Sequence, residues 1–279
     1  MKQPPDYLLL GHFTTDVLPD GKCVPGGTSL YAALAAHRLG LTVSIVSAQI
    51  TLPPDWPATI DIAFHPTYTP PTFENRYTTK GRQQILHTAT SSTAMADVPF
   101  GWRGAPIVHL GPMLQEIPED FVLAFPQALL GVTPQGWMRA WGPQLPTPIQ
   151  YKPWLPSPEL LSHIDVVVVS IEDVQGDEAL IAYYAQTCKL VALTRGSLGA
   201  TLFWEGVPYH IPAVIVHEVD PTGAGDVFAA ALLVYLRETS NPLEAARIAS
   251  YVAAISVQGR GASHIPTRDE IEHYVHSGE

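Results

Sequence analysis

The sequence predicts an α/β protein with a mainly parallel central β-sheet and helices on both faces, and two observations lead to this class. Short, almost wholly apolar runs recur along the chain, at residues 7–10, 107–110, 166–169 and 190–193. Runs this short are typical of strands buried on both faces, as in a parallel sheet. Alanine-rich stretches that suit closely packed helices stand at 30–39 and 227–236. Strands that alternate with helices indicate parallel connections.

The length of the chain favours a single domain over residues 1–279. A chain of 279 residues can bury one large core, and single α/β domains of this size are common. Alternating residues at 72–77 and 83–87 predict a small hairpin sheet outside this core. We therefore expect one domain that carries a small β appendage.

Charge and composition exclude several classes of partner. The net charge is −11, from 26 acidic and 15 basic residues, and the basic residues form no cluster, so we expect no nucleic-acid partner. No apolar run has the length of a membrane span, and the first residues lack the apolar core of a signal peptide. With only two cysteines, these features predict a cytoplasmic, reduced protein without a membrane partner.

The segment Asp220–Asp226 and the apolar run that follows it are the strongest functional signal. We expect a helix to begin within Gly223-Ala224-Gly225, where small residues leave backbone N–H groups uncovered and the helix dipole favours an anion. Asp226 would then stand beside a bound phosphate, where it could act as a general base. The alternative is a plain helix-entry turn whose first-turn acid complements the dipole.

A second candidate region lies near the N-terminus. Asp16 follows the predicted strand at 7–10, and ligands of open α/β sheets bind beyond the carboxyl ends of the strands. Asp16 is therefore a candidate to bind a polar substrate, although an aspartate in a turn is the alternative. Gly26-Gly27 followed by Thr28 opens an alanine-rich helix that ends at Gly40.

Together these segments resemble the ribokinase-like (PfkB) carbohydrate kinase family. The sequence Asp-Pro-Thr-Gly-Ala-Gly-Asp at 220–226 is similar to its C-terminal signature, and Asp16 with Gly26-Gly27 to its N-terminal one. The resemblance extends from about residue 7 to about 266 and is weakest over 50–105. It implies the ribokinase-like fold, with a small β lid formed by residues about 12–25 and 70–90. It also implies transfer of the γ-phosphoryl group of ATP, with magnesium, to a hydroxyl group.

The resemblance implies roles for particular residues. The base would be Asp226, beside an anion hole formed by the backbone of Gly223, Ala224 and Gly225. Substrate would be bound by Asp16, Gly26, Gly27, Thr28, Asn75 and Arg139. The nucleotide would be bound by Ser170, Asp173, Thr194, Arg195, Gly196, Gly199, Ala253 and Val257. A solvated strand face is the alternative for Asn75, and an exposed guanidinium the alternative for Arg139.

Two metal sites are also implied. Asp173 or Glu172 would contribute to magnesium placement through water, at positions where the family usually has Asn-x-x-Glu and this chain has Ser170 and Asp173. A monovalent cation such as potassium would be held near Asp220, Thr222 and Gly261. We also expect the helix dipole and amides to keep the pKa of Asp226 low.

The acceptor is expected to be a small neutral sugar or cyclitol. Ribokinase proper has Lys and Asn where Thr28 and Tyr31 stand here, and the segment Gly11–Leu18 resembles the myo-inositol kinase branch. Myo-inositol is thus the first acceptor to test. The alternatives are a nucleoside kinase of the same fold and a non-catalytic nucleotide-binding regulatory module. The resemblance further implies a monomer or a homodimer formed through the lid.

Overall fold

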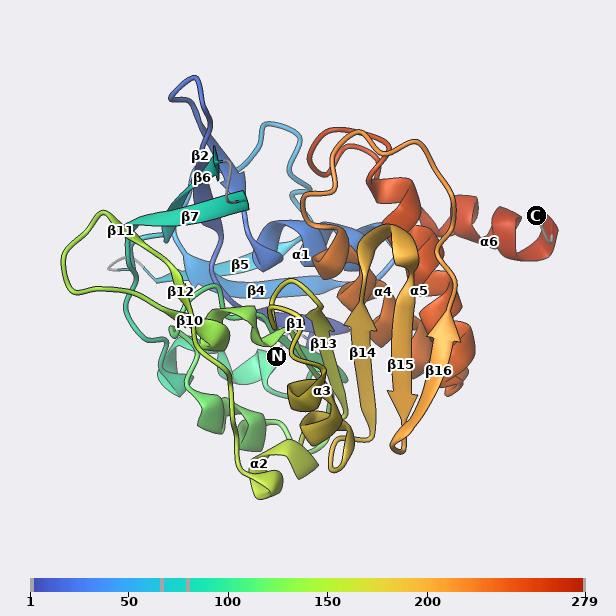
Figure 1. Ribbon diagram of the computed structural model, residues 1–279. Coiled ribbons are helices and arrows are strands. Elements are labelled where there is room, and N and C mark those ends of the chain that lie inside the picture. Colours follow the sequence, from blue (N-terminus) through green and yellow to red (C-terminus); the bar gives the residue numbers. More distant parts are fainter. Residues whose placement is uncertain (1–2, 66–67, 79–80, 278–279) are drawn as a thin grey trace.

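The centre of the molecule is a nine-stranded sheet in the order β16-β15-β14-β13-β9-β8-β1-β4-β5. The computed structural model describes residues 3–65, 68–78 and 81–277 (Figure 1). The strands from β5 to β14 are mutually parallel, whereas β15 and β16 complete one edge as an antiparallel hairpin. The predicted mainly parallel sheet is therefore confirmed.

The four apolar runs of the sequence all form central strands. The strands of this sheet are β1 (Tyr7–Leu10), β4 (Val43–Ala48), β5 (Asp61–His65), β8 (Ile107–Leu110), β9 (Leu129–Val132), β13 (Val166–Ser170), β14 (Leu190–Thr194), β15 (Ala200–Trp204) and β16 (Val207–Ile211). Every residue of β1, β4 and β8 is buried. Burial on both faces explains why these strands are mostly apolar rather than alternating, with Ser44, Ser47 and His109 as their buried polar residues.

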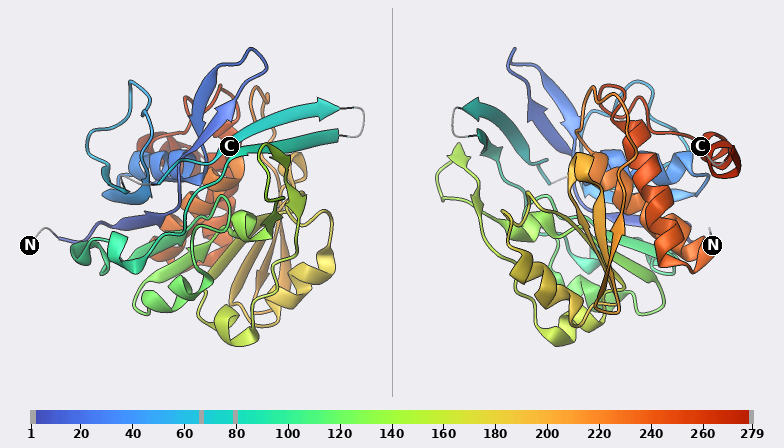
Figure 2. Two further views of the ribbon diagram at one scale, coloured as in Figure 1. Left: turned by 90° about the vertical axis from the view of Figure 1, so that its left-hand side faces the viewer. Right: turned by 45° about the vertical axis from the view of Figure 1, so that its right-hand side comes forward.

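Helices cover both faces of the sheet and form two hydrophobic cores (Figures 1 and 2). One face carries α1 (Thr28–Arg38), α4 (Ala224–Thr239) and α5 (Pro242–Ser256), and the other carries α2 (Pro158–Ser162) and α3 (Glu178–Ala185). The last helix, α6 (Arg268–Ser277), packs on α5. Among the described helices, none is long and apolar enough to cross a membrane.

A second sheet of five strands projects from the end of the central sheet at which β13 and β14 finish (Figures 1 and 2). Its strands, in spatial order, are β11 (Thr147–Pro148), β7 (Gly81–Thr88), β6 (Thr72–Thr78), β2 (Thr14–Val17) and β3 (Cys23–Gly26). The lid ranges expected from the sequence contain four of these strands, while residues 79–80 lie outside the described residues. A further small ribbon pairs β10 (Arg139–Ala140) with β12 (Gln150–Tyr151); neither this ribbon nor β11 was predicted.

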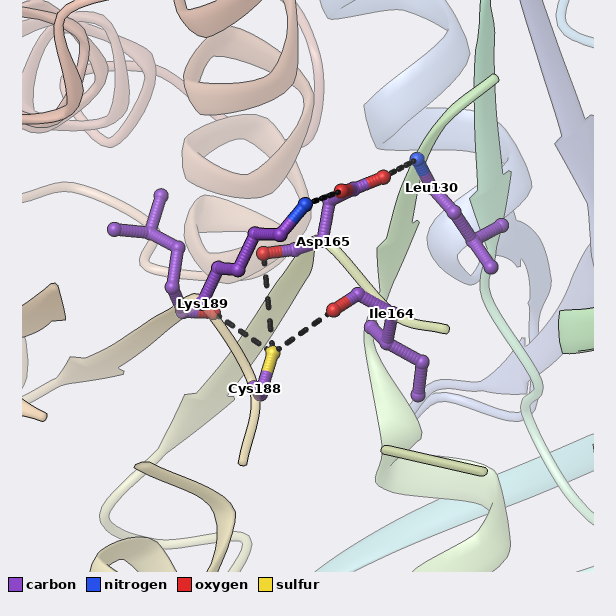
Figure 3. Close-up of polar contacts among 6 residues, drawn as sticks. Leu130, Ile164, Asp165, Cys188 and Lys189 are labelled. Atoms are coloured by element: carbon purple, nitrogen blue, oxygen red, sulfur yellow. Dashed lines mark hydrogen bonds and ion pairs between the residues drawn. The ribbon is translucent and has the colours of Figure 1, made fainter. Parts of the chain in front are cut away.

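Side chains tie three strands together at the opposite end of the central sheet (Figure 3). The Leu130 N–H donates to Asp165 Oδ2 at 3.0 Å, and Lys189 Nζ lies 3.5 Å from Asp165 Oδ1. The thiol of Cys188 faces the carbonyl of Ile164 at 3.2 Å, and burial raises the pKa of this thiol to about 11. A thiol that stays protonated and buried is a packing group here rather than a nucleophile.

Helix α4 lies close to the sheet because β9 contributes a glycine beneath it. A Cβ atom at Gly131 would lie 2.5 Å from Cδ1 of Leu233, which is 1% exposed. This close approach seats the whole helix, including its N-terminal turn, against the strands.

We expect Gly131→Ala to destabilise the protein by about 1–3 kcal/mol, because the added methyl group overpacks the contact with Leu233. The measurement is chemical denaturation of Gly131→Ala, Leu233→Ala and the double variant. Because the two residues share one contact, the double variant should lose less stability than the sum of the single losses. Additive losses would contradict the packing described here.

Candidate active site

The predicted glycine turn forms the start of α4. Gly223 is the N-cap, with φ of +80° in the left-handed region, and a Cβ atom there would overlap the ring of Tyr31. Glycine is therefore required at this position by both its backbone conformation and the space available. Gly225, in contrast, is exposed, and a side chain there would meet nothing within 4 Å.

Two of the three expected anion-hole amides are available. Within the part of the chain that the structure describes, the N–H groups of Gly223 and Gly225 have no intramolecular acceptor, whereas the N–H of Ala224 donates to the Pro221 carbonyl at 3.2 Å. Uncovered amides at a helix N-terminus, with the positive end of the dipole behind them, form a cradle for a phosphate group. The turn thus fits a phosphate through its two glycines, while Ala224 closes the turn.

Asp226 lies in the first turn of α4 and receives a hydrogen bond from Thr28. The Thr28 hydroxyl donates to Asp226 Oδ1 at 2.7 Å. Burial raises the pKa of Asp226 to about 6; the Thr28 hydrogen bond opposes this shift, the charge of Asp173 adds to it, and Arg139 opposes it. The residue nonetheless keeps partial access to solvent, so an acceptor can reach the carboxylate.

The expectation of a low pKa for Asp226 is therefore wrong. The helix dipole is outweighed because protein atoms replace water around most of the carboxylate and a second acid lies nearby. A carboxylic acid with a pKa near neutrality is a better general base than an ordinary aspartate.

Of the two acids expected to serve magnesium, Asp173 faces the base. Its Oδ2 accepts from the Ser170 N–H at 3.1 Å, and its Oδ1 accepts from Gln135 Nε2 at 2.7 Å. Its charge reaches Asp226, whereas Glu172 is exposed. No three His, Cys, Asp or Glu side chains converge among the described residues. Asp173 is the acid that would contribute to holding a magnesium ion bound with the donor.

Arg139 is buried beside the base, so the alternative of an exposed guanidinium is wrong. Its side chain donates to the Met113 carbonyl at 2.5 Å, and its Cζ lies 5.0 Å from the centre of the Phe73 ring. The positive charge is close enough to lower the pKa of Asp226. Sequence reasoning missed Met113, Phe73 and Gln135, because nothing in their local sequence indicates a site.

Asp16 and Gly26 meet on the side of the site formed by the second sheet. The two strands pair antiparallel, and a Cβ atom at Gly26 would overlap the Asp16 carboxylate. Thr14 Oγ1 also donates to Asp16 Oδ1 at 3.3 Å. Gly27, the N-cap of α1, has φ of +87°. The Asp16 carboxylate therefore needs a glycine at position 26, whereas Gly27 is favoured by its left-handed backbone angle.

Tyr31 joins the two halves of the site. Burial raises the pKa of its hydroxyl, and the charges of Asp220, Asp16 and Asp226 raise it further, so the ring lies within reach of all three acids. Asn75 is half-buried on β6 and accepts from Gln84 Nε2 at 3.3 Å. Its side chain is therefore not on a fully solvated strand face.

The expected nucleotide residues lie at the end of β14, in the loop after it, and on or just after α5. A Cβ atom at Gly199 (φ +82°) would overlap the Ile211 carbonyl, and the Val257 carbonyl accepts from the N–H groups of Val219 and Asp220 at 2.8 and 3.1 Å. Thr194 ends β14, Gly196 follows in the next loop, and Ala253 lies on α5. The Arg195 side chain instead forms an ion pair with Glu178 at 2.8 Å.

The three residues expected around a monovalent cation lie in contact, because backbone N–H groups of two of them donate hydrogen bonds to the carboxylate of the third. Asp220 accepts from the N–H groups of Thr222 and Gly261 at 3.0 and 2.9 Å. Partial burial favours a higher pKa for Asp220, yet these hydrogen bonds outweigh it and lower the pKa. The Asp220 carboxylate thus links the two loops through their N–H groups, and the potassium site stays a prediction.

Part of the chain matches the sequence model of a known protein family. Residues 155–268 match the model of the "pfkB family carbohydrate kinase". This match contains the glycine turn, Asp226 and the expected nucleotide residues described above. Over these residues the chain resembles the ribokinase-like, or pfkB, family.

Relatives of this family align with part of the chain. The ribokinase of Haemophilus influenzae is 33% identical over 127 residues, which cover 41% of this chain and 42% of that enzyme. The ribokinase of Mus musculus is 41% identical over 78 residues, covering 26% of this chain and 24% of that enzyme. The chain therefore aligns with less than half the length of these relatives.

Solved structures share the ribokinase-like fold over almost the whole chain. A pyrophosphate-dependent kinase in the ribokinase family, complexed with a pyrophosphate analog and myo-inositol, superposes with a TM-score of 0.76 at 21% identity, covering 96% of this chain and 99% of that one. Ribokinase from Arabidopsis thaliana, complexed with ribose and ATP, gives 0.70 at 18% identity, covering 97% and 98%. At these identities the likeness establishes the fold.

The two glycines of the turn should respond differently to substitution. Gly223→Ala is expected to lower the melting temperature by several degrees, because alanine is strained at this backbone angle and overlaps Tyr31. Gly225→Val should melt within about two degrees of the parent, since its side chain enters open space, and should weaken binding of phosphate-containing ligands. Equal melting temperatures for both variants would contradict the described turn.

Asp226→Asn should raise stability at neutral pH while removing the base. The folded-state pKa of Asp226 is raised to about 6. Stability is therefore lost as the pH rises from about 4 to about 6, and this loss remains complete at higher pH. The variant is therefore expected to be more stable by about 1–3 kcal/mol at pH 7.5 and equal to the parent near pH 4. Denaturation at both pH values measures this difference; a variant less stable at pH 7.5 would contradict the shift.

Proposed function

We propose that this protein is a kinase that transfers the γ-phosphoryl group of ATP to a hydroxyl of a small neutral sugar or cyclitol. The observation that carries the proposal is the joining of a base and an anion cradle in one turn. Asp226, with its raised pKa, follows directly after the uncovered amides of Gly223 and Gly225. A carboxylate next to a bound phosphate is electrostatically unfavourable. It is explained if the carboxylate takes the proton of a hydroxyl group that attacks the phosphorus atom.

The chemistry follows from this arrangement. The acceptor hydroxyl donates to Asp226, its oxygen forms a bond to the γ-phosphorus, and the bond from that phosphorus to the leaving oxygen of ADP breaks. The proton passes to Asp226 and then to solvent. The Gly223 and Gly225 amides oppose the negative charge on the transferring group, and Arg139 adds a buried positive charge nearby. A magnesium ion bound with the donor would supply further neutralisation of the phosphates.

The acceptor side supports a neutral, hydroxyl-rich ring. The Asp16 carboxylate over Gly26 can accept hydrogen bonds from hydroxyl groups, and the buried ring of Tyr31 can cover an apolar face of the acceptor. Thr28, an uncharged residue, follows Gly26-Gly27, so this position offers no positive charge to an acceptor that carries phosphate. Myo-inositol is our first candidate, supported by the myo-inositol bound in one structural neighbour. A nucleoside kinase is the alternative.

Pyrophosphate is a second candidate donor. A neighbour that superposes over 99% of its own chain is described as pyrophosphate-dependent. A cradle of backbone amides recognises phosphate groups whether or not adenosine is attached. Arg195, expected at the nucleotide, is occupied by Glu178. ATP remains the first donor to test because Val257, expected at the nucleotide, contacts the segment that leads into the cradle.

The decisive experiment is a phosphorylation panel. Inositols, ribose, fructose, adenosine, cytidine and fructose 6-phosphate are each tested with ATP or pyrophosphate and magnesium, with and without potassium. We expect turnover of a neutral polyol and little turnover of fructose 6-phosphate. Asp16→Ala should raise the acceptor KM by at least about tenfold and the donor KM by less than about threefold, because charged hydrogen bonds to the acceptor are lost.

The controls separate the alternatives. Asp226→Asn should reduce turnover by at least about a hundredfold while donor binding persists. Strong turnover of adenosine or cytidine would establish the nucleoside kinase instead. Donor binding without phosphorylation of any acceptor would support the non-catalytic module. Equal changes in both KM values for Asp16→Ala would mean that Asp16 has a structural role.

A further inference from the structure

We infer that Thr28 is a positioning residue for the base: its hydroxyl holds Oδ1 of Asp226 and so presents Oδ2 to the acceptor hydroxyl. The catalytic part of this inference rests on the proposed function, whereas the contact between the two side chains does not. The sequence alone suggested a different role, in which Thr28 binds substrate. The structure turns its hydroxyl toward Asp226 instead.

The rotamer of Thr28 is fixed from two sides. Thr28 is the first residue of α1 and is 5% exposed. Its Cγ2 methyl packs against Gly111, the residue that follows β8; a Cβ atom at Gly111 would lie 2.5 Å from this methyl group. Its Oγ1 lies 2.7 Å from Asp226 Oδ1 and 3.5 Å from Met113 Sδ. A β-branched side chain held at both branches cannot turn its hydroxyl elsewhere without losing the methyl contact.

Thr28 is the direct hydrogen-bond donor of this carboxylate. Among the described residues, no other side chain donates a hydrogen bond to Asp226, and Oδ2 has no protein donor. A hydroxyl has one hydrogen to give, so a Thr28 that donates to Asp226 cannot donate to the acceptor as well. The hydrogen bond both orients the carboxylate plane and favours its ionised form.

The other charged or titratable groups around Asp226 act on it through charge or are neutral, and do not orient its carboxylate by a hydrogen bond. Asp173 repels the charge of Asp226, and Arg139 attracts it from the lid side. Tyr31 and Tyr7 are buried hydroxyls whose pKa values are raised, so both are neutral. His109, which hydrogen-bonds Tyr7 at 2.7 Å, has its pKa lowered to about 3 by burial and is neutral as well. Tyr7, Tyr31 and His109 therefore stay neutral while Asp226 titrates.

The test compares Thr28→Val, which keeps the branched shape, with Thr28→Ser, which keeps the hydroxyl. The carboxyl signal of Asp226 is followed by carbon-13 NMR with labelled aspartate and is assigned by its loss in Asp226→Asn. Thr28→Val is expected to raise the pKa of Asp226 by about one unit, and Thr28→Ser to leave it within a few tenths. Thr28→Ala serves as a second hydroxyl-free variant if Thr28→Val does not fold.

Kinetics provide the second readout. In Thr28→Val, kcat at neutral pH should fall about 10- to 100-fold and the acidic limb of the pH profile should move up, with both KM values changed less than about threefold. Thr28→Ser should recover kcat to within about threefold. Ser29→Ala is the matched control, because Ser29 donates to the Gly11 carbonyl, away from the base, and should leave the limb unmoved.

Other results would overturn the inference. A raised acceptor KM with an unmoved Asp226 titration would make Thr28 a substrate-binding residue. An unmoved titration in both hydroxyl-free variants would show that the hydrogen bond does not act on the base. If the panel of acceptors shows no turnover, the proposed function fails, but the NMR titration still decides whether Thr28 governs Asp226.

Discussion

The site depends on one tight contact, between the left-handed backbone of Gly223 and the ring of Tyr31. The contact lets α1 and α4 approach until the first turn of α4 lies between the two sheets. Asp226 and the free amides then take their positions from the helix rather than from a mobile loop. Groups held by regular elements keep their geometry better than groups on loops, and this favours a site whose charge must be placed accurately.

The sequence was sufficient for the fold and for part of the site. Apolar runs and glycine turns are local signals, so the parallel sheet and the start of α4 could be predicted from them. The burial of Arg139 and its contact with Met113 could not, because they depend on how the turn at 134–138 packs against a loop that is remote in sequence. The pKa of Asp226 was misjudged for a related reason: desolvation is a property of the assembled surroundings.

The base illustrates a conflict between stability and chemistry. A buried carboxylate beside Asp173 is an unfavourable group in the folded protein, and the protein retains it with one neutral donor and one distant cation in place of a direct ion pair. A direct ion pair would lower the pKa and weaken the base. The arrangement is consistent with selection for proton affinity rather than for maximal stability.

The phosphate cradle and the expected acceptor residues come from different parts of the chain. The phosphate cradle and its surroundings come from the C-terminal part of the chain, within the region that matches the family model, while Asp16, Gly26 and Asn75 come from the N-terminal part and stand on the second sheet. Thr28 and Tyr31 join the two parts through their contacts with Asp226 and Gly223, so only the residues on the second sheet can vary independently of the cradle. A lineage could keep one way of activating phosphate and exchange the molecule that receives it by altering a few strands, so a family match over residues 155–268 describes the transfer better than its recipient.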